Sequence, residues 1–209
     1  MKKTVITLGV LVGLLVFGLV VVGLIIAAGY NKLVSQSQGV DKAWAQVQNV
    51  YQRRADLIPN LVQTVQGAAN FEKSTLTEIT EARASVGKVQ INNAPTEAAK
   101  LAEFEQAQGR LSSALSRLLL VVEKYPDIKA TANFRDLQAQ LEGTENRISV
   151  ERGNFNNAVQ VNNTSIRSFP EVFYAGMFGF KERPYFAAKP GAEDAPKVQF
   201  DFNKPAKPK

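Results

Sequence analysis

The sequence predicts an all-α protein that consists of an N-terminal transmembrane helix, an elongated antiparallel helical bundle and a flexible C-terminal tail. Residues 4–28 carry no charge, and a helix of that length rises about 37 Å, enough to cross a hydrocarbon core about 30 Å thick. After this segment, apolar residues recur at three- and four-residue steps, as in helices that bury one face. No segment alternates apolar and polar residues long enough to predict a sheet. We place the anchor at 1–29, the bundle at 30–180 and the tail at 181–209.

The N-terminal apolar segment has an alternative interpretation as a cleaved signal peptide. The apolar region of a signal peptide spans about 7–15 residues and ends in a small-x-small cleavage site. Here the apolar run is about twice as long, and its small residues Ala27, Ala28 and Gly29 come only at the far end, which favours a permanent anchor. Lys2 and Lys3 precede it, so the positive-inside rule favours a cytoplasmic N-terminus by a margin of about one charge.

The composition excludes several classes of site. The chain has no Cys and no His, which removes disulfides, Cys-liganded and His-liganded zinc, Ser-His-Asp hydrolysis and the Glu-x-x-His di-iron motif. Its net charge is +6, but acidic residues interleave with the basic ones. No stripe of Lys and Arg with interleaved aromatic residues predicts nucleic-acid binding.

The apolar pattern predicts the helices in order. A first helix follows the anchor, with a stripe from Val40 to Ala69 and a kink where Pro59 removes a backbone donor. A break near 67–70 leads to a second helix, or to a continuation of the first, over about 71–89. Residues 91–96 are predicted to form a loop, with Thr96 as a cap for a third helix over 96–125.

The fourth predicted helix is the longest and covers residues 127–169. Its apolar residues keep a near-heptad rhythm that Thr144, Arg152 and Asn162 interrupt. Residues 171–180 are rich in aromatic residues and predict a short amphipathic helix. The tail that follows is rich in Pro, Ala and Lys, with a small apolar segment at 198–202.

Charged residues on the first and fourth helices are candidates for a polar core or an interface. Arg53 and Asp56 are close enough for an ion pair within one helix, and a contact to lipid phosphates or a partner is the alternative. Glu142 and Glu145 could together hold a cation or act as acid and base, but we favour a buried polar network that fixes helix register. The candidate residues for this network or interface are Arg53, Arg54, Asp56, Arg83, Arg117, Glu142, Glu145 and Arg147.

The asparagine and aromatic clusters near the end of the bundle each have two interpretations. Five asparagines between residues 154 and 163 predict a polar face, with contacts between chains as the alternative. The aromatic segment predicts a cap on its own bundle, or else a patch that meets a neighbour or the lipid interface. The candidate residues for an assembly contact are Phe173, Tyr174, Phe178 and Phe180.

Short motifs spread along the chain resemble the LemA family of bacterial membrane proteins. They begin with NVYQRRADLIPNLV at residues 49–62 and EARA at 81–84, and continue with LSRL at 115–118, EKYPD at 123–127, LQAQLE at 137–142, TENRI at 144–148, SFP at 168–170 and APKV at 195–198. The resemblance implies one N-terminal membrane helix, a long antiparallel helical domain and no established enzymatic activity. Some relatives are associated with building magnetosome membranes, and others with genes for membrane metalloproteases.

These observations predict a single-pass protein of the bacterial inner membrane whose bundle lies on the periplasmic side. We expect a scaffold that self-associates laterally, in contact with membrane lipid, with no catalytic activity, no cofactor, no metal and no nucleic-acid partner. The alternative is a membrane-tethered binding module, or adaptor, for a membrane protease or another membrane protein. An enzyme that uses Glu142 and Glu145 is a third alternative.

Overall fold

The computed structural model describes residues 2–67, 71–89 and 91–187. The helices are α1 (Lys2–Gln66), α2 (Lys73–Lys88), α3 (Ala98–Val122), α4 (Pro126–Lys129) and α5 (Ala132–Arg167), followed by the 3-10 turn η1 (Glu171–Phe173). No strand occurs in these ranges, so the predicted all-α fold is confirmed for the described part of the chain. With 65 residues, α1 is about 97 Å long.

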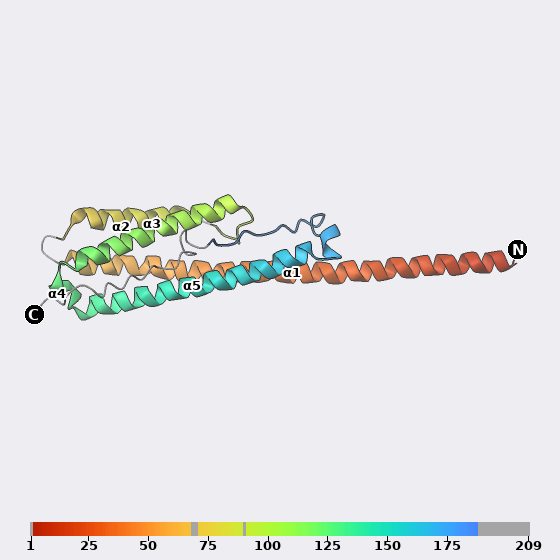
Figure 1. The fold of residues 1–209 in the computed structure, drawn as a ribbon, viewed down its shortest axis with the longest axis horizontal. Coiled ribbons are helices and arrows are strands. Elements are labelled where there is room, and N and C mark those ends of the chain that lie inside the picture. Colours follow the sequence, from red (N-terminus) through yellow and green to blue (C-terminus); the bar gives the residue numbers. More distant parts are fainter. Residues whose placement is uncertain (1, 68–70, 90, 188–209) are drawn as a thin grey trace, which may run out of the picture.

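The helix α1 is the axis of the molecule (Figure 1). The long helix α5 runs antiparallel to the second half of α1, and α2 and α3 form an antiparallel hairpin beside them. The first part of α1 projects alone, and its large apolar side chains from Ile6 to Ile25 are exposed. This part is long and apolar enough to cross a bilayer, as the sequence predicts for a transmembrane span.

Three apolar clusters follow one another along the bundle. A distal cluster contains Ile58, Leu61 and Val65 of α1 and receives residues from α2, α3, α4 and α5. A central cluster surrounds Trp44, whose ring lies near those of Phe104, Phe155 and Phe186. A third, small cluster lies nearest the projecting part of α1 and contains Leu33, Tyr174 and Ala175. The buried stripe that the sequence predicts on α1 from Val40 onward supplies the distal and central clusters, whereas Leu33 of the third cluster lies before it.

Two predicted elements differ from the structure. The single helix over 127–169 is wrong, because the chain forms the short α4, turns at 130–131 and starts α5 at Ala132. Thr131 caps α5, since its side-chain oxygen accepts a hydrogen bond from the Phe134 N–H at 3.3 Å. The amphipathic helix predicted over 171–180 is also wrong. This segment forms only the turn η1 followed by further turns. Gly179 has a φ of 81°, a backbone conformation that favours glycine.

Proline 59 lies inside α1, and the helix continues through it. Figure 1 shows no sharp bend along α1, whereas the sequence predicted a kink there. Proline has no N–H for the carbonyl four residues earlier, which belongs to Ala55. Arg83 of α2 donates its Nε–H to that carbonyl oxygen at 3.0 Å. The acceptor that Pro59 leaves without its helical donor is therefore satisfied from a neighbouring helix.

Candidate functional site

The side chain of Arg54 lies between the distal and central clusters, and only 2% of it is exposed. Its Nη1 donates to Ser112 Oγ of α3 at 2.9 Å and to Glu145 Oε2 of α5 at 3.0 Å. Its Nη2 donates to the backbone and side-chain carbonyl oxygens of Gln108. The guanidinium carbon lies 5.0 Å from the centre of the Tyr51 ring. One buried cation thus joins three helices.

Helical spacing explains why these residues meet. On each helix the polar residue falls between apolar residues of the same buried stripe, with Arg54 between Tyr51 and Ile58 on α1. Gln108 lies between Phe104 and Leu111 on α3, and Glu145 lies beside Thr144 between Leu141 and Ile148 on α5. A shift of α5 by four residues would place Leu141 or Ser149 where Glu145 lies, and neither supplies a carboxylate. The arrangement has the geometry expected of a device that sets helix register.

A second ion pair lies nearer the anchor, one turn from Gln108 along α3 and two turns from Glu145 along α5. Arg152 of α5 contacts Glu105 of α3 at 2.6 Å, and its guanidinium lies 4.5 Å from the centre of the Phe186 ring. Burial raises the pKa of Glu105, although the neighbouring Arg152 lowers it. Burial likewise raises the pKa of Tyr51. Among the described residues, no group of three or more His, Cys, Asp or Glu is placed to hold a metal ion.

Two adjoining hollows form a groove between α3 and α5. One, of about 330 Å³, is lined by Leu115, Leu119 and Leu141 together with the polar residues around Arg54. The other, of about 610 Å³, extends past Tyr51 and Arg152 to Ala187. Arg54, Ser112 and Glu145 line both. We call this feature the α3–α5 groove.

The extended segment 181–187 continues the same line toward the anchor. Asn163 of α5 donates to the Arg183 carbonyl and accepts from the Arg183 N–H, both at 2.9 Å. Asn156 makes the same two bonds to Phe186, at 3.1 and 2.9 Å. Asn156 and Asn163 are seven helical residues apart, and Arg183 and Phe186 are three extended residues apart. Both spacings are about 10 Å, so each asparagine lies opposite the residue of this segment that it binds. We call residues 181–187 the strap; the sequence assigned them to the tail.

The remaining candidate residues lie apart from Arg54. Arg53 and Arg147 are exposed, Asp56 accepts from Gln52 at 2.7 Å, and Glu142 accepts from Gln138 at 3.0 Å. Arg117 pairs with Glu78 of α2 at 3.0 Å, and Arg83 binds the Ala55 carbonyl. Of the predicted network, the structure therefore brings together only Arg54 and Glu145.

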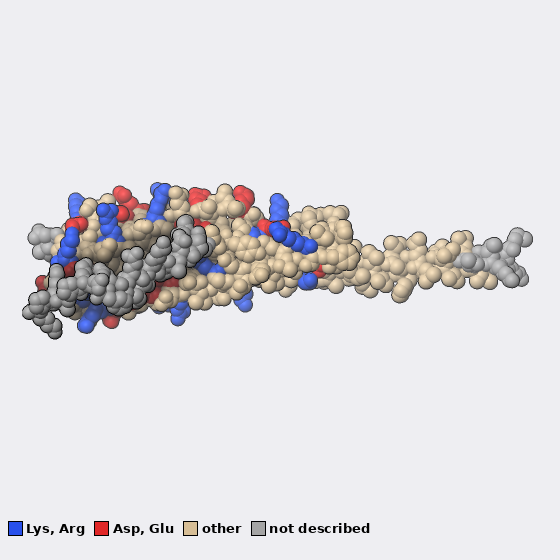
Figure 2. All heavy atoms as spheres, viewed as in Figure 1, with Lys and Arg blue, Asp and Glu red and all other residues tan. Residues whose placement is uncertain are grey.

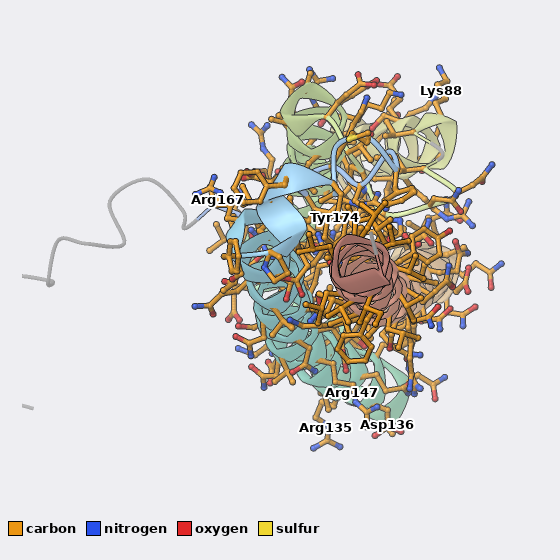
Figure 3. All side chains as sticks on the ribbon, turned by 90° about the vertical axis from the view of Figure 1, so that its right-hand side faces the viewer. Lys88, Arg135, Asp136, Arg147, Arg167 and Tyr174 are labelled. Carbon is orange, nitrogen blue, oxygen red and sulfur yellow. The ribbon has the colours of Figure 1, made fainter. Side chains whose placement is uncertain are left out.

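The aromatic candidates lie where α1 leaves the bundle. Tyr174 is buried beside α1, as Figure 3 shows in a view along that helix, and Phe180 is half-buried. A Cβ on Gly29 would overlap the Tyr174 hydroxyl, so only glycine permits this approach. Phe173 and Phe178 are exposed. The apolar segment predicted at 198–202 lies outside the described residues.

Sequence reasoning missed the partners on the third helix and the roles of two asparagines. The sequence placed Gln108 on the buried side of the third helix but gave no partner for it, and Ser112 gave no signal. Asn156 and Asn163 were grouped with their neighbours as a polar face. Their seven-residue spacing was a signal that could have set them apart.

Comparison with known proteins now adds to these observations. The family model described as "LemA family" matches residues 43–200. This range includes α2 to α5, the strap, and Arg54 with its partners Gln108, Ser112 and Glu145, which we call the Arg54 layer. This chain belongs to the LemA family. The resemblance in its sequence motifs is thereby confirmed.

Several named proteins are similar in sequence to this LemA-family chain. It is 28% identical to Magnetosome protein MamQ 2 of Paramagnetospirillum magneticum and 26% identical to Magnetosome protein MamQ of Magnetospirillum gryphiswaldense. Each of these matches covers 78% of this chain and 66%, just under two thirds, of the relative. Protein LemA of Metamycoplasma hominis is 23% identical, over 66% of this chain and 60% of the relative. Together with the apolar part of α1, these relatives fit a membrane-associated protein.

Proposed function

We propose that this protein is a single-pass, membrane-anchored scaffold that self-associates laterally through α5. Its apolar anchor would hold it in the bacterial inner membrane with the bundle on the periplasmic side. The proposal assigns no reaction to the protein. It rests above all on the outer face of α5, and the magnetosome relatives are compatible with a part in membrane organisation.

The outer face of α5 changes character along its length. Its exposed residues in the half far from the anchor include Arg135, Asp136, Glu142 and Arg147. Between residues 149 and 164 the charged residues Glu151 and Arg152 are half-buried, and the exposed positions carry no charge; these are Ser149, Val150, Gly153, Asn154, Asn157, Gln160, Val161 and Thr164. Protein interfaces are depleted in Lys, Glu and Asp, so the half of α5 nearer the anchor has the composition of a contact surface.

Five of these residues follow coiled-coil spacing. Val150, Asn154, Asn157, Val161 and Thr164 are separated by four, three, four and three residues, and Val150 and Val161 are 60% and 53% exposed. We call these five residues the α5 strip. Anchors in one membrane hold two copies parallel, so their strips could meet in a parallel seam. Asparagine within such a seam favours one register and a defined oligomer at a cost in stability.

Light scattering combined with size-exclusion chromatography tests this proposal on full-length protein in mild detergent. We expect an oligomer that dissociates in the double variant Val150→Glu/Val161→Glu, because four like charges would face one another in a dimer. Leu120→Glu is the matched control, since Leu120 is exposed on α3 away from the strip. A wild-type protein that stays monomeric over a wide concentration range would overturn the proposal.

Crosslinking in cells tests the geometry of the seam. Because the chain has no native Cys, Asn157→Cys gives a single thiol on the strip. A parallel seam places two copies of residue 157 opposite each other, so a short bifunctional reagent should trap a dimer. The same reagent should trap no dimer through Leu120→Cys. Labelling of Asn93→Cys by an impermeant thiol reagent in intact cells tests the periplasmic side, because Asn93 is exposed in the loop before α3.

The α3–α5 groove favours a second function, a membrane-tethered adaptor. Its apolar wall and the half-exposed Glu145 could receive a segment of a membrane protease or of another membrane protein. Leu119→Arg would obstruct the groove without touching the α5 strip. Loss of a crosslinked partner protein with intact self-association would support the adaptor, and loss of self-association would count against both assignments.

A further inference from the structure

Residues 169–180 pack against one side of α1 at the point where it leaves the bundle, and we call them the collar. Tyr30 of α1 makes edge-to-face contacts with Phe178 and Phe180, with ring centres 5.3 and 5.6 Å apart. Tyr174 packs against Leu33 and beside Gly29. Lys32 pairs with Glu171 at 3.1 Å. These contacts attach the collar to α1 over residues 29–33.

The outer surface of the collar is strongly apolar. Phe169, Phe173 and Met177 are 80%, 72% and 85% exposed, and Val172 and Phe178 are about half exposed. Phe169 and Phe173 contact each other edge to face at 5.9 Å and leave their other faces open. Glu171, the only charged residue of the collar, is buried against Lys32. Exposed clusters of this kind mark contact surfaces in native proteins.

The position of the collar identifies the partner. The exposed apolar side chains of α1 extend to Ile25, and Gly29 lies four residues, or about 6 Å, further along the helix. The polar zone on each side of a bilayer is about 5–8 Å thick, so the collar lies level with the lipid headgroups when residues 6–25 lie in the hydrocarbon core. Aromatic side chains prefer this depth.

The distribution of charge agrees with this placement. Figure 2 shows Lys, Arg, Asp and Glu mostly over the body of the bundle and few near the end from which α1 emerges, where Lys32 pairs with Glu171 and Arg167 pairs with Glu182. A low density of charge at this end favours a membrane contact, because each charge taken into the interface costs desolvation.

We propose that the collar binds lipid, with Phe169, Phe173 and Met177 inserted at the boundary between headgroups and acyl chains of the leaflet nearest the bundle. A single spanning helix leaves a domain free to tilt and rotate above the membrane. The collar adds a second contact with the membrane, beside α1, and so holds the bundle in one orientation. This contact does not depend on self-association of the α5 strip.

Site-directed spin labelling of full-length protein in nanodiscs tests the lipid contact. Single cysteines replace Phe173 or Met177, and a nitroxide label reports collisions with oxygen, which concentrates in lipid, and with a water-soluble nickel chelate. Val16→Cys, within the apolar part of α1, is the lipid reference. Leu120→Cys is the water reference, because Leu120 is exposed at the distal end of α3.

We expect the labels at 173 and 177 to lose most of their nickel collisions relative to position 120 and to approach the oxygen accessibility of position 16. Met177 makes no ring contact, so its replacement tests the collar without disturbing Phe169; circular dichroism confirms the fold of each variant. Nickel collisions at 173 and 177 equal to those at 120 would overturn the proposal. Protection that appears only when two copies share one nanodisc would also overturn it, because a second copy would then cover the collar.

Discussion

Arg83 makes the hydrogen bond that Pro59 cannot make, because its Nε–H binds the carbonyl oxygen of Ala55 at 3.0 Å. This relationship couples the sequence of α1 to its packing against α2. A proline in the middle of a long helix normally leaves an acceptor without its helical donor. Here the neighbouring helix supplies the donor, and α1 continues beyond the proline to Gln66.

The first prediction concerns this pair. Arg83→Met should destabilise the bundle by about 1 kcal/mol, because the Ala55 carbonyl loses its donor. Pro59→Ala restores a helical N–H for the same carbonyl, so Arg83→Met should cost less in that background. Chemical denaturation followed by Trp44 fluorescence measures both steps. Arg53→Met, at an exposed position of α1, is the control, and an equal loss for Arg83→Met in both backgrounds would contradict the assignment.

The second prediction concerns the Arg54 layer. Glu145→Leu should destabilise the protein by about 1–3 kcal/mol, because the buried guanidinium keeps only neutral partners and its Nε has none. Glu145→Gln keeps an acceptor and should cost less. The double variant Arg54→Met/Glu145→Leu should recover much of the loss, because it removes the buried charge as well. Urea unfolding of the four proteins gives the comparison, and a double variant as unstable as Glu145→Leu would refute the explanation.

The third prediction concerns the strap. Asn156→Ala and Asn163→Ala each remove two hydrogen bonds to the strap backbone, a loss of about 1–3 kcal/mol. We expect the Phe186 and Arg183 amides, respectively, to exchange with deuterium faster, as measured by NMR or mass spectrometry. Asn157→Ala, one residue from Asn156 but exposed, should leave their exchange unchanged. Faster exchange in Asn157→Ala as well would mean that the asparagines act only through helix stability.

The sequence was most informative where a local pattern decides the structure. Apolar residues at helical spacing located the buried face of α1 from Val40 onward, and the same residues supply the distal and central clusters. Arg54 and Glu145 were predicted as parts of a polar network because Glu145 belongs to the densest polar cluster of the fourth predicted helix and an arginine of a neighbouring helix can pair with it. Their third partner, α3, could not be predicted, since nothing in Gln108 or Ser112 indicates which helix they face.

It was least informative where distant contacts decide. The strap looked like a tail because residues 181–187 have no periodicity of their own, and Phe186 is buried through distant residues, namely Trp44 and Phe155. Its backbone is held by the Asn156 amide, which lies 30 residues earlier. The turn before α5 was missed because the apolar rhythm continues across it. Thr131, three residues before Phe134, carried the signal of a helix start but was not used.

The fourth prediction is a pH dependence of the collar. The backbone N–H of Glu171 and then the Lys32 side chain hold the pKa of Glu171 below its ordinary value of 4.5. A lowered carboxyl pKa contributes stability that is present above the unfolded pKa and is lost as the pH falls through the folded pKa. Collar attachment, measured as protection of the collar from protease, should therefore weaken below about pH 4.5. Glu171→Gln should flatten this dependence, whereas Glu103→Gln on α3 should preserve it.

The last prediction tests the close approach of Tyr174 to α1. Gly29→Ala places a methyl group where the Tyr174 hydroxyl lies, so we expect a loss of about 1–3 kcal/mol in collar stability. Tyr174→Phe removes that oxygen, and the nearest ring carbon then lies 3.1 Å from the added carbon. Since the hydroxyl is buried without a hydrogen-bond partner, Tyr174→Phe alone should be neutral or stabilising and should reduce the effect of Gly29→Ala. Protease protection of the collar in the four proteins measures this coupling. If Gly29→Ala costs the same with Tyr174 or Phe at position 174, the glycine is required for a reason other than this contact.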